Sequence, residues 1–273
     1  MNQSPQRIAF IGGGNMAGAI IGGLRKQGLP AAGISVVEPF ADARARLKQQ
    51  FGVEAMEHAG PALAGAGLVV WAVKPQTFKE AAAQAKPHVG GALHLSVAAG
   101  IRSDSIATWL ASERIVRSMP NTPALVGKGM TALYARPGVS ADDRTRVEAV
   151  IATTGEHLWV AQEQHLDAVT ALSGSGPAYV FYFLEAMVQA GGEMGLSPEQ
   201  ARRLAVGTFA GASELARASS EPLQVLRERV TSKGGTTYAA LTSLEHDKVK
   251  NAFVRALHAA CRRAEELGDE FGR

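Results

Sequence analysis

The stretch Ile8-Ala9-Phe10-Ile11-Gly12-Gly13-Gly14-Asn15-Met16-Ala17 decides the fold predicted for this chain. A short apolar run leads into a Gly-x-Gly-x-x-Ala segment, and an amphipathic stretch follows at 16–27. In this setting Gly12 permits the tight turn, and Gly14 allows a pyrophosphate to approach the backbone. Ala17 keeps the helix close to the sheet, and the helix N-terminus faces the anion. The segment therefore predicts dinucleotide binding.

Outward from this segment, the first 160 residues alternate short β-branched runs with Ala-rich amphipathic stretches. Runs without polar alternation are typical of parallel strands that helices cover on both faces. The predicted strands are 7–11, 34–38, 68–72, 93–97, 115–117, 129–135 and 156–160. The predicted helices are 16–27, 41–51, 76–86, 103–111 and 141–153. This order predicts an α/β fold with an N-terminal Rossmann-type, doubly wound sheet.

After about residue 162 the strand signals stop and helical patterns take over. Helices are predicted at 179–194, at 198–218 with Ser197 as the N-cap, and along a final apolar stripe at 249–267. The first of these is apolar nearly all round, so more of it must be buried than a small domain arranges alone. We therefore predict a Rossmann domain at residues 1–161 and an all-helical domain at 162–273. The helical domain is predicted to form an intertwined homodimer.

Composition narrows the class of protein. The 273 residues are 46% hydrophobic and 19% charged with a net charge of +3, which suits a globular chain and excludes a disordered one. The basic residues are dispersed, so no nucleic-acid partner is expected. The N-terminal residues Met1–Arg7 have no signal pattern, and Gly and Pro interrupt the charge-free stretch Ala168–Leu184, so no membrane segment is expected.

Cysteine and histidine usage argues against a metal site. Cys261 is the single cysteine, so it has no intramolecular disulfide partner, and we expect a cytoplasmic location. The seven histidines form no H-x-x-x-H pair, and no cysteine cluster accompanies them.

Glu38 ends the second predicted strand, 24 positions after Gly14, close to where an acidic residue binds the adenosine ribose. A carboxylate repels a 2′-phosphate and therefore favours NADH. Arg44 and Arg46 follow, and they either neutralise that charge or lie on a solvated helix face. The choice between NADH and NADPH stays open at this point.

Further candidate segments lie where strands end or where apolar helices are interrupted. The segments Ala72–Gln76, Ser96–Gly100 and Arg117–Pro123 follow strands and should face the crevice of an open sheet. In the helical half, Leu172–Ala178 and Val230–Thr237 are polar and Gly-rich. Each of these segments can also be interpreted simply as a turn or a helix cap. The last one has more hydroxyls and free amides than a cap requires, which suits a small carboxylate.

Together these motifs resemble the pyrroline-5-carboxylate reductase family along essentially the whole chain. The motifs are Ile11–Met16, Ala72–Gln76, Met119–Pro123, Ser173–Ala178 and Gly234–Thr237. The resemblance implies reduction of 1-pyrroline-5-carboxylate to L-proline with NADPH or NADH, the last step of proline synthesis. It also implies a Rossmann domain, a helical domain that exchanges helices with a partner, and dimers that assemble into rings of five, a decamer.

The resemblance also implies roles for particular residues. Those expected along the cofactor, with Glu38 from the spacing argument above, are Ile11, Gly12, Gly13, Gly14, Asn15, Met16, Ala72, Val73, Lys74, Pro75 and Asn121. Ser232, Gly235 and Thr236 are expected to bind the substrate carboxylate. Thr237 is expected to direct its hydroxyl at the ring nitrogen, as the catalytic residue, in a mechanism that is mostly positioning. Lys233 stands where the family usually has proline, which removes a fixed φ from this loop.

Two other functions are weighed against this one. A β-hydroxyacid dehydrogenase has the same domain order and uses a catalytic lysine in its helical domain, and Lys233 is the candidate here. Oxidation of a 3-hydroxy acid with NAD would favour that reading. A non-catalytic cofactor sensor is the third function, and tight cofactor binding without turnover would favour it. A sensor has no need of the two Gly-rich substrate segments.

Overall fold

The computed structural model describes residues 7–272, which form two compact units. The first unit comprises the residues up to Ser175 together with those from Ala260 onward, and the second comprises Gly176–Ala259. The predicted domains, 1–161 and 162–273, stay a prediction, and their residues 1–6 and 273 lie outside the described part of the chain.

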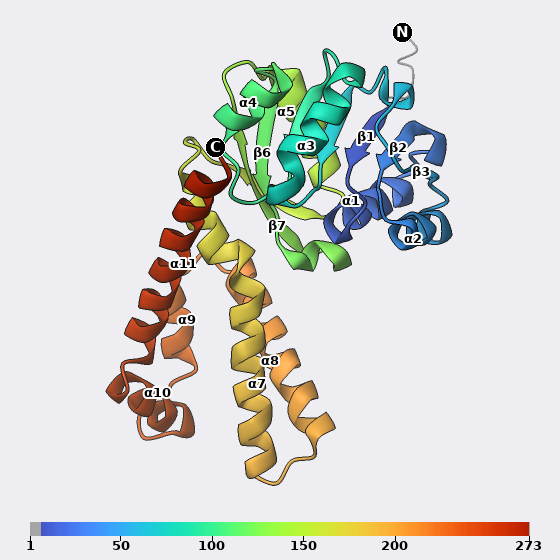
Figure 1. The fold of residues 1–273 in the computed structure, drawn as a ribbon. Coiled ribbons are helices and arrows are strands. Elements are labelled where there is room, and N and C mark those ends of the chain that lie inside the picture. Colours follow the sequence, from blue (N-terminus) through green and yellow to red (C-terminus); the bar gives the residue numbers. More distant parts are fainter. Residues whose placement is uncertain (1–6, 273) are drawn as a thin grey trace. The chain divides into compact units, whose positions relative to one another are not determined.

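The first unit is built on an eight-stranded sheet in the order β3-β2-β1-β4-β5-β6-β7-β8 (Figure 1). The strands are β1 Ile8–Ile11, β2 Ile34–Val37, β3 Ala55–Met56, β4 Leu68–Trp71, β5 Leu93–Ser96, β6 Ile115–Met119, β7 Gly129–Ala135 and β8 Gly155–Trp159. Neighbouring strands are parallel except β6 and β7, which are antiparallel. The chain order reverses beside β1, so β1 and β4 flank the switch point where α/β sheets bind ligands.

Helices cover both faces of this sheet. The first unit contains α1 Asn15–Lys26, α2 Ala41–Phe51, α3 Pro75–Ala85, α4 Ser103–Leu110, α5 Ala141–Ile151 and α6 His165–Val169. The second unit contains α7 Gly176–Glu193, α8 Pro198–Ala218, α9 Leu223–Arg229 and α10 Thr236–His246, and α11 Val249–Phe271 begins in the second unit and ends in the first. Phe10 packs in one core with α1 and α5, whereas its neighbour Ile11 packs in a second core with α3 and α4. Alternate residues of one strand thus serve two cores, which explains the runs without polar alternation.

An aromatic group fills the second core. Trp71 stacks on Phe78 with ring centroids 5.1 Å apart, and Phe78 lies 5.8 Å from Trp109. The Trp71 indole Nε1 donates a hydrogen bond of 3.3 Å to Nδ1 of buried His94 on β5. Burial, together with the charge of Arg114, lowers the pKa of His94 to about 4. His94 is therefore a neutral core residue at physiological pH.

The predicted elements and the fold class are confirmed. Each predicted strand is present within one or two residues at its ends, and the two-residue strand β3 is an addition that sequence reasoning did not find. The predicted Ser197 N-cap is confirmed as a capping box, in which the Ser197 hydroxyl accepts from the Gln200 amide at 3.2 Å.

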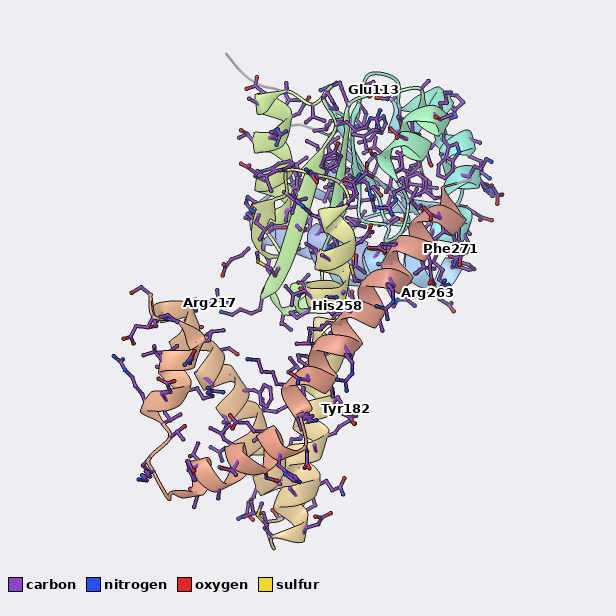
Figure 2. The ribbon with its side chains drawn as sticks, turned by 90° about the vertical axis from the view of Figure 1, so that its left-hand side faces the viewer. Glu113, Tyr182, Arg217, His258, Arg263 and Phe271 are labelled. Carbon is purple, nitrogen blue, oxygen red and sulfur yellow. The ribbon has the colours of Figure 1, made fainter. Side chains whose placement is uncertain are left out.

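The second unit consists of helices, and much of its apolar surface is exposed. α7 and α8 approach closely where Gly191 faces Ala201, because a Cβ on Gly191 would lie 2.8 Å from the Cβ of Ala201. Phe253 of α11 meets Tyr179 and Phe183 of α7, each with ring centroids 5.6 Å apart. Tyr182 on the same helix is 70% exposed (Figure 2). An apolar helix exposed to this degree in one chain needs a further surface to cover it.

Among residues 7–272, no helix has the length and apolar character needed to cross a membrane. Over the same residues, no group of three His, Cys, Asp or Glu side chains is arranged to hold a metal ion.

Candidate functional site

The Gly-rich turn between β1 and α1 is compressed on one side and open on the other. Gly12 has φ +97°, its amide donates to the Val37 carbonyl at 2.8 Å, and a Cβ on it would collide with the Ala72 carbonyl oxygen. Gly14 is exposed, and a Cβ on it would meet no atom within 4 Å. The turn therefore requires glycine at the first position for its own packing. At the third position it leaves free space beside the backbone.

The N-terminus of α1 opens onto that space. Gly14 is the N-cap, and within the described chain no side chain caps the helix, so its first amides keep their hydrogen-bonding capacity. Asn15 is exposed and Met16 is half-buried, whereas Ala17 is fully buried against the sheet. Open amides and a positive helix terminus are what a pyrophosphate requires, so the residues present fit a dinucleotide.

Glu38 lies directly against the turn. Its side chain is buried, one carboxylate oxygen accepts from the Gly13 amide at 2.7 Å, and the other accepts from the Phe40 amide at 2.9 Å. A Cβ on Gly13 would lie 3.2 Å from the Glu38 side chain, so the two residues are in direct contact. The predicted acidic residue is therefore beside the Gly-rich turn, bound to its backbone.

The segment after β4 lies on the other side of the turn. Ala72 donates to the Ile11 carbonyl at 2.8 Å, and a methyl group of Val73 lies 3.1 Å from an ideal Cβ on Gly12. Pro75 begins α3 in the N1 position, which suits its fixed φ, and Lys74 before it is exposed. The structure thus brings Ala72 and Val73 together with the Gly-rich turn, and it leaves Lys74 exposed to solvent.

Asn121 has a different environment, because its side-chain amide is engaged within the first unit. Its Nδ2 donates to the Ser173 hydroxyl at 3.2 Å and more weakly to the Ser173 carbonyl at 3.4 Å. Its Oδ1 accepts from the Met130 amide at 2.9 Å. Asn121 therefore joins the turn Thr122–Val126 to β7 and to the Ser173 segment. Its role toward a cofactor stays a prediction.

The Ser173 segment is a π-helix at Thr170–Gly174, placed between α6 and α7 in the sequence. A Cβ on its last residue, Gly174, would meet the terminal methyl group of Met119, the far end of a flexible side chain that can move aside. Sequence reasoning read this segment as a helix cap or a functional island and missed the π-helix. Such turns recur at functional sites in proteins.

A buried ionic network also escaped the sequence reading. The Arg117 Nη1 donates to Glu163 at 2.5 Å, and the same carboxylate accepts from the Ser103 amide and hydroxyl, each at 2.6 Å. Arg102 donates to Asp167 of α6 at 2.8 Å. Burial lowers the pKa of the Arg117 guanidinium, and the Glu163 carboxylate opposes that shift. The network fixes the start of α6 to β6 and α4. An arginine within the apolar strand at 115–119 was the available signal.

In the second unit, the loop at 231–235 leads into α10. Gly234 has φ +74°, Gly235 is the N-cap, and the Gly235 amide donates to the Ser232 carbonyl at 3.0 Å. The Ser232 hydroxyl oxygen lies 2.6 Å from an ideal Cβ on Gly235, so hydroxyl and glycine are in contact. A side chain on Gly235 would therefore displace this hydroxyl.

Thr236 and Thr237 are the first two residues of α10, and no side chain caps this helix within the described residues. Ser232, Gly235, Thr236 and Thr237 thus form one group at a helix N-terminus, with hydroxyls and open amides suited to a carboxylate. Lys233 is exposed, and the residue of this loop with a left-handed backbone conformation is its neighbour Gly234. The loop is flanked by Arg229, which pairs with Glu221 through two contacts of 2.6 Å.

Comparisons with known proteins agree along the chain. Residues 163–267 match the family model for pyrroline-5-carboxylate reductase dimerisation, and residues 7–100 match the model for NADP oxidoreductase, coenzyme F420-dependent. The chain is 44% identical over 271 residues to pyrroline-5-carboxylate reductase of Pseudomonas aeruginosa, covering 98% of this chain and 99% of that protein.

Solved structures give the same result. A pyrroline-5-carboxylate reductase from Coxiella burnetii is similar with a TM-score of 0.89 and 37% identity, covering 97% of this chain and 99% of that one. A Plasmodium falciparum pyrroline carboxylate reductase with NADP bound has a TM-score of 0.86 and 29% identity, covering 96% and 98%.

Proposed function

This chain belongs to the pyrroline-5-carboxylate reductase family, and we propose that it reduces 1-pyrroline-5-carboxylate to L-proline with NADPH or NADH. The reaction adds a hydride to the imine carbon and a proton to the imine nitrogen, and it is the last step of proline biosynthesis. The observation that carries the proposal for the site is the open N-terminus of α10, with Ser232, Thr236 and Thr237 around it. It offers a small carboxylate both hydroxyls and backbone amides.

The cofactor is bound by the first unit in this proposal. Its pyrophosphate occupies the space beside Gly14, where the amides at the start of α1 are open. Ile11, Met16, Ala72, Val73, Lys74, Pro75 and Asn121 complete its proposed surroundings, with Glu38 at the adenosine end. When bound, the reduced nicotinamide supplies the hydride.

The substrate is bound by the second unit. Ser232, Gly235 and Thr236 hold the carboxylate, which fixes the ring relative to α10. Thr237 lies in the first turn of that helix and directs its hydroxyl at the imine nitrogen. A threonine hydroxyl is a weak acid, so it orients the imine and hydrogen-bonds to it, or to a water that delivers the proton.

The test is the initial rate of oxidation of NADH and NADPH with 1-pyrroline-5-carboxylate as substrate. Turnover with either cofactor supports the proposal. Absence of turnover in protein that binds cofactor would reject this substrate. Oxidation of a 3-hydroxy acid with NAD⁺ would then favour the dehydrogenase function, and binding without any turnover would favour a sensor.

The proposed assembly is a homodimer with intertwined helices. Residues 163–267 match a dimerisation family, and α7 exposes Phe181, Tyr182 and Met187 by 57%, 70% and 40%. The family resemblance extends the proposal to a decamer of five dimers. Multi-angle light scattering after gel filtration distinguishes a dimer from a decamer, and a monomer would reject both.

The proposed location is the cytoplasm, supported by the single Cys261 and by the family resemblance. No membrane or nucleic acid takes part in the proposed reaction. Immunodetection in separated cell fractions tests the location, and recovery with the membranes would contradict it.

A further inference from the structure

The side chain of Glu38 connects the Gly-rich turn to the segment that follows β2. One of its oxygens accepts from Gly13 and the other from Phe40, and only 6% of the residue is exposed. A carboxylate offers about four lone-pair sites, and these two bonds use two of them. The charge is therefore fixed in place beside the predicted dinucleotide, with capacity left to accept further hydrogen bonds.

Arg44 is one of the two arginines that could neutralise a 2′-phosphate, and its guanidinium is already engaged in other bonds. Arg44 Nη1 donates to the backbone carbonyls of Glu38 and Pro39 at 2.9 and 2.6 Å. Its Nη2 pairs with Glu57 at 3.2 Å. Binding a phosphate at this guanidinium would require breaking bonds that hold the segment after β2. Arg44 thus supports the backbone that carries Glu38.

Arg46 lines a cavity to which Glu38 does not contribute. It is exposed on α2 and lines a cavity of about 640 Å³ beside α1, together with Gly18, Gly22 and Phe51. Glu38 is absent from the lining of that cavity, although Gly13 and Gly14 are part of it. Arg46 is therefore a second candidate on α2 for neutralising a 2′-phosphate, and it needs its own variant.

From these contacts we propose that Glu38 is the specificity residue of this chain and selects NADH over NADPH. The proposal rests on the proposed function, because it assigns the adenosine end of the same cofactor site. The remaining lone pairs of the carboxylate accept hydrogen bonds from the ribose 2′- and 3′-hydroxyls. A 2′-phosphate has no proton to offer there and adds negative charge beside a buried carboxylate, where water and salt screen little.

A second consequence concerns the turn itself. Because Glu38 accepts from Gly13, its side chain also positions the loop that contacts the pyrophosphate. Two substitutions distinguish the effect of the Glu38 charge from the effect of its hydrogen bond to the turn. Glu38→Gln removes the charge and the acceptor for the Phe40 amide but retains an oxygen that accepts from Gly13, whereas Glu38→Ala removes the charge and both acceptors. The first variant should lose selectivity, and the second should also bind both cofactors more weakly.

The experiment is isothermal titration calorimetry of the full chain with NADH and NADPH, without the imine substrate. Wild type is expected to bind NADH at least tenfold more tightly than NADPH, and Glu38→Gln is expected to reduce that ratio at least tenfold. Glu54→Gln is the matched control. It removes the same charge from an exposed carboxylate that pairs with Lys48 and makes no bond to the turn, so the ratio should not change.

Titration with adenosine 5′-monophosphate and adenosine 2′,5′-bisphosphate assigns the effect to the adenosine end, and wild type should prefer the first. Equal or tighter binding of NADPH by wild type would overturn the proposal. So would an unchanged ratio in a folded Glu38→Gln variant, or a ratio that responds to Arg46→Ala but not to Glu38→Gln. Selective NADH binding without turnover would reject the proposed reaction while leaving the role of Glu38 intact.

Discussion

Arg117 and Glu163 form a buried ion pair in which Nη1 lies 2.5 Å from the carboxylate oxygen. Arg117 is on β6, between β5 and β7 in the sheet, and Glu163 precedes α6 by two residues. The Nε of Arg117 is buried without a hydrogen-bond partner among the described residues. The guanidinium therefore depends strongly on its carboxylate partner.

Removal of one charge from this pair should destabilise the first unit. Glu163→Gln leaves the Arg117 charge buried without full compensation, and loss of one partner of a buried pair costs about 3–5 kcal/mol. Urea unfolding followed by circular dichroism measures this change. Glu266→Gln is the control, because Glu266 pairs with Arg263 where both side chains are more than half exposed, and such surface pairs contribute little to stability (Figure 2). Equal losses in the two variants would contradict the role given to burial.

Substitutions at the two outer glycines of the turn, Gly12 and Gly14, should affect different properties, the first mainly stability and the second mainly cofactor affinity. Gly12→Ala places a methyl group against the Ala72 carbonyl at a φ unfavourable for alanine, which should cost about 3 kcal/mol of stability or more. Gly14→Ala meets no neighbouring atom and should change stability by less than about 1 kcal/mol. It should nevertheless weaken cofactor binding, since its methyl group enters the space beside α1. Thermal unfolding and calorimetry check both outcomes, and unchanged affinity in Gly14→Ala would remove that space from the site.

The buried imidazole of His94 should make stability depend on pH. Its pKa falls from an ordinary 6.5 to about 4 in the folded protein, so the unfolded chain binds more protons between these values. Stability is therefore complete above pH 6.5 and decreases as the pH falls toward 4, by up to about 3 kcal/mol. His94→Gln should flatten this part of the curve of unfolding free energy against pH. The exposed His58→Gln should not, and a curve unaltered by His94→Gln would exclude His94 as the cause.

The hydroxyl of Thr237 should matter for catalysis more than for folding. Thr237→Ala is expected to lower kcat by about tenfold to a hundredfold, the range typical of lost orienting or proton-transfer assistance. Thr237→Ser should recover most of the rate. Thr242→Ala, five residues further along α10, loses a local bond to the Tyr238 carbonyl and should keep wild-type kinetics. Steady-state rates with 1-pyrroline-5-carboxylate measure these effects, and a Thr237→Ala variant with the wild-type kcat would remove this residue from the mechanism.

The predicted elements could be found because each of them carries a local signal of its own. The apolar run at 8–11 has neighbours on both faces, and its alternate residues enter two different cores. Ser197 followed three residues later by Gln200 is a signature that needs no tertiary information. The strand β3 has two residues and pairs through Val36 and Val37, so its existence depends on β2 rather than on its own sequence.

The side-chain contacts of the site were less accessible to sequence reasoning. Asn121 and Ser173 are 52 positions apart, and neither the hydrogen bond between them nor the π-helix has a local pattern. Glu38 could be placed near the turn by spacing, but its bond to Gly13 and the engagement of Arg44 required coordinates. Spacing along the chain indicates which residues lie near one another. The hydrogen-bond partner of each donor and acceptor is known only from the three-dimensional structure.

The aromatic group around Trp71 has a spectroscopic consequence. The chain has three tryptophans, at 71, 109 and 159, and all of them belong to the first compact unit. Light absorbed near 295 nm therefore excites the sheet-containing unit alone, while the helical unit contributes only tyrosine absorption at shorter wavelength. Tryptophan emission excited near 295 nm therefore follows the unfolding of the sheet-containing unit in the intact chain, without any added label.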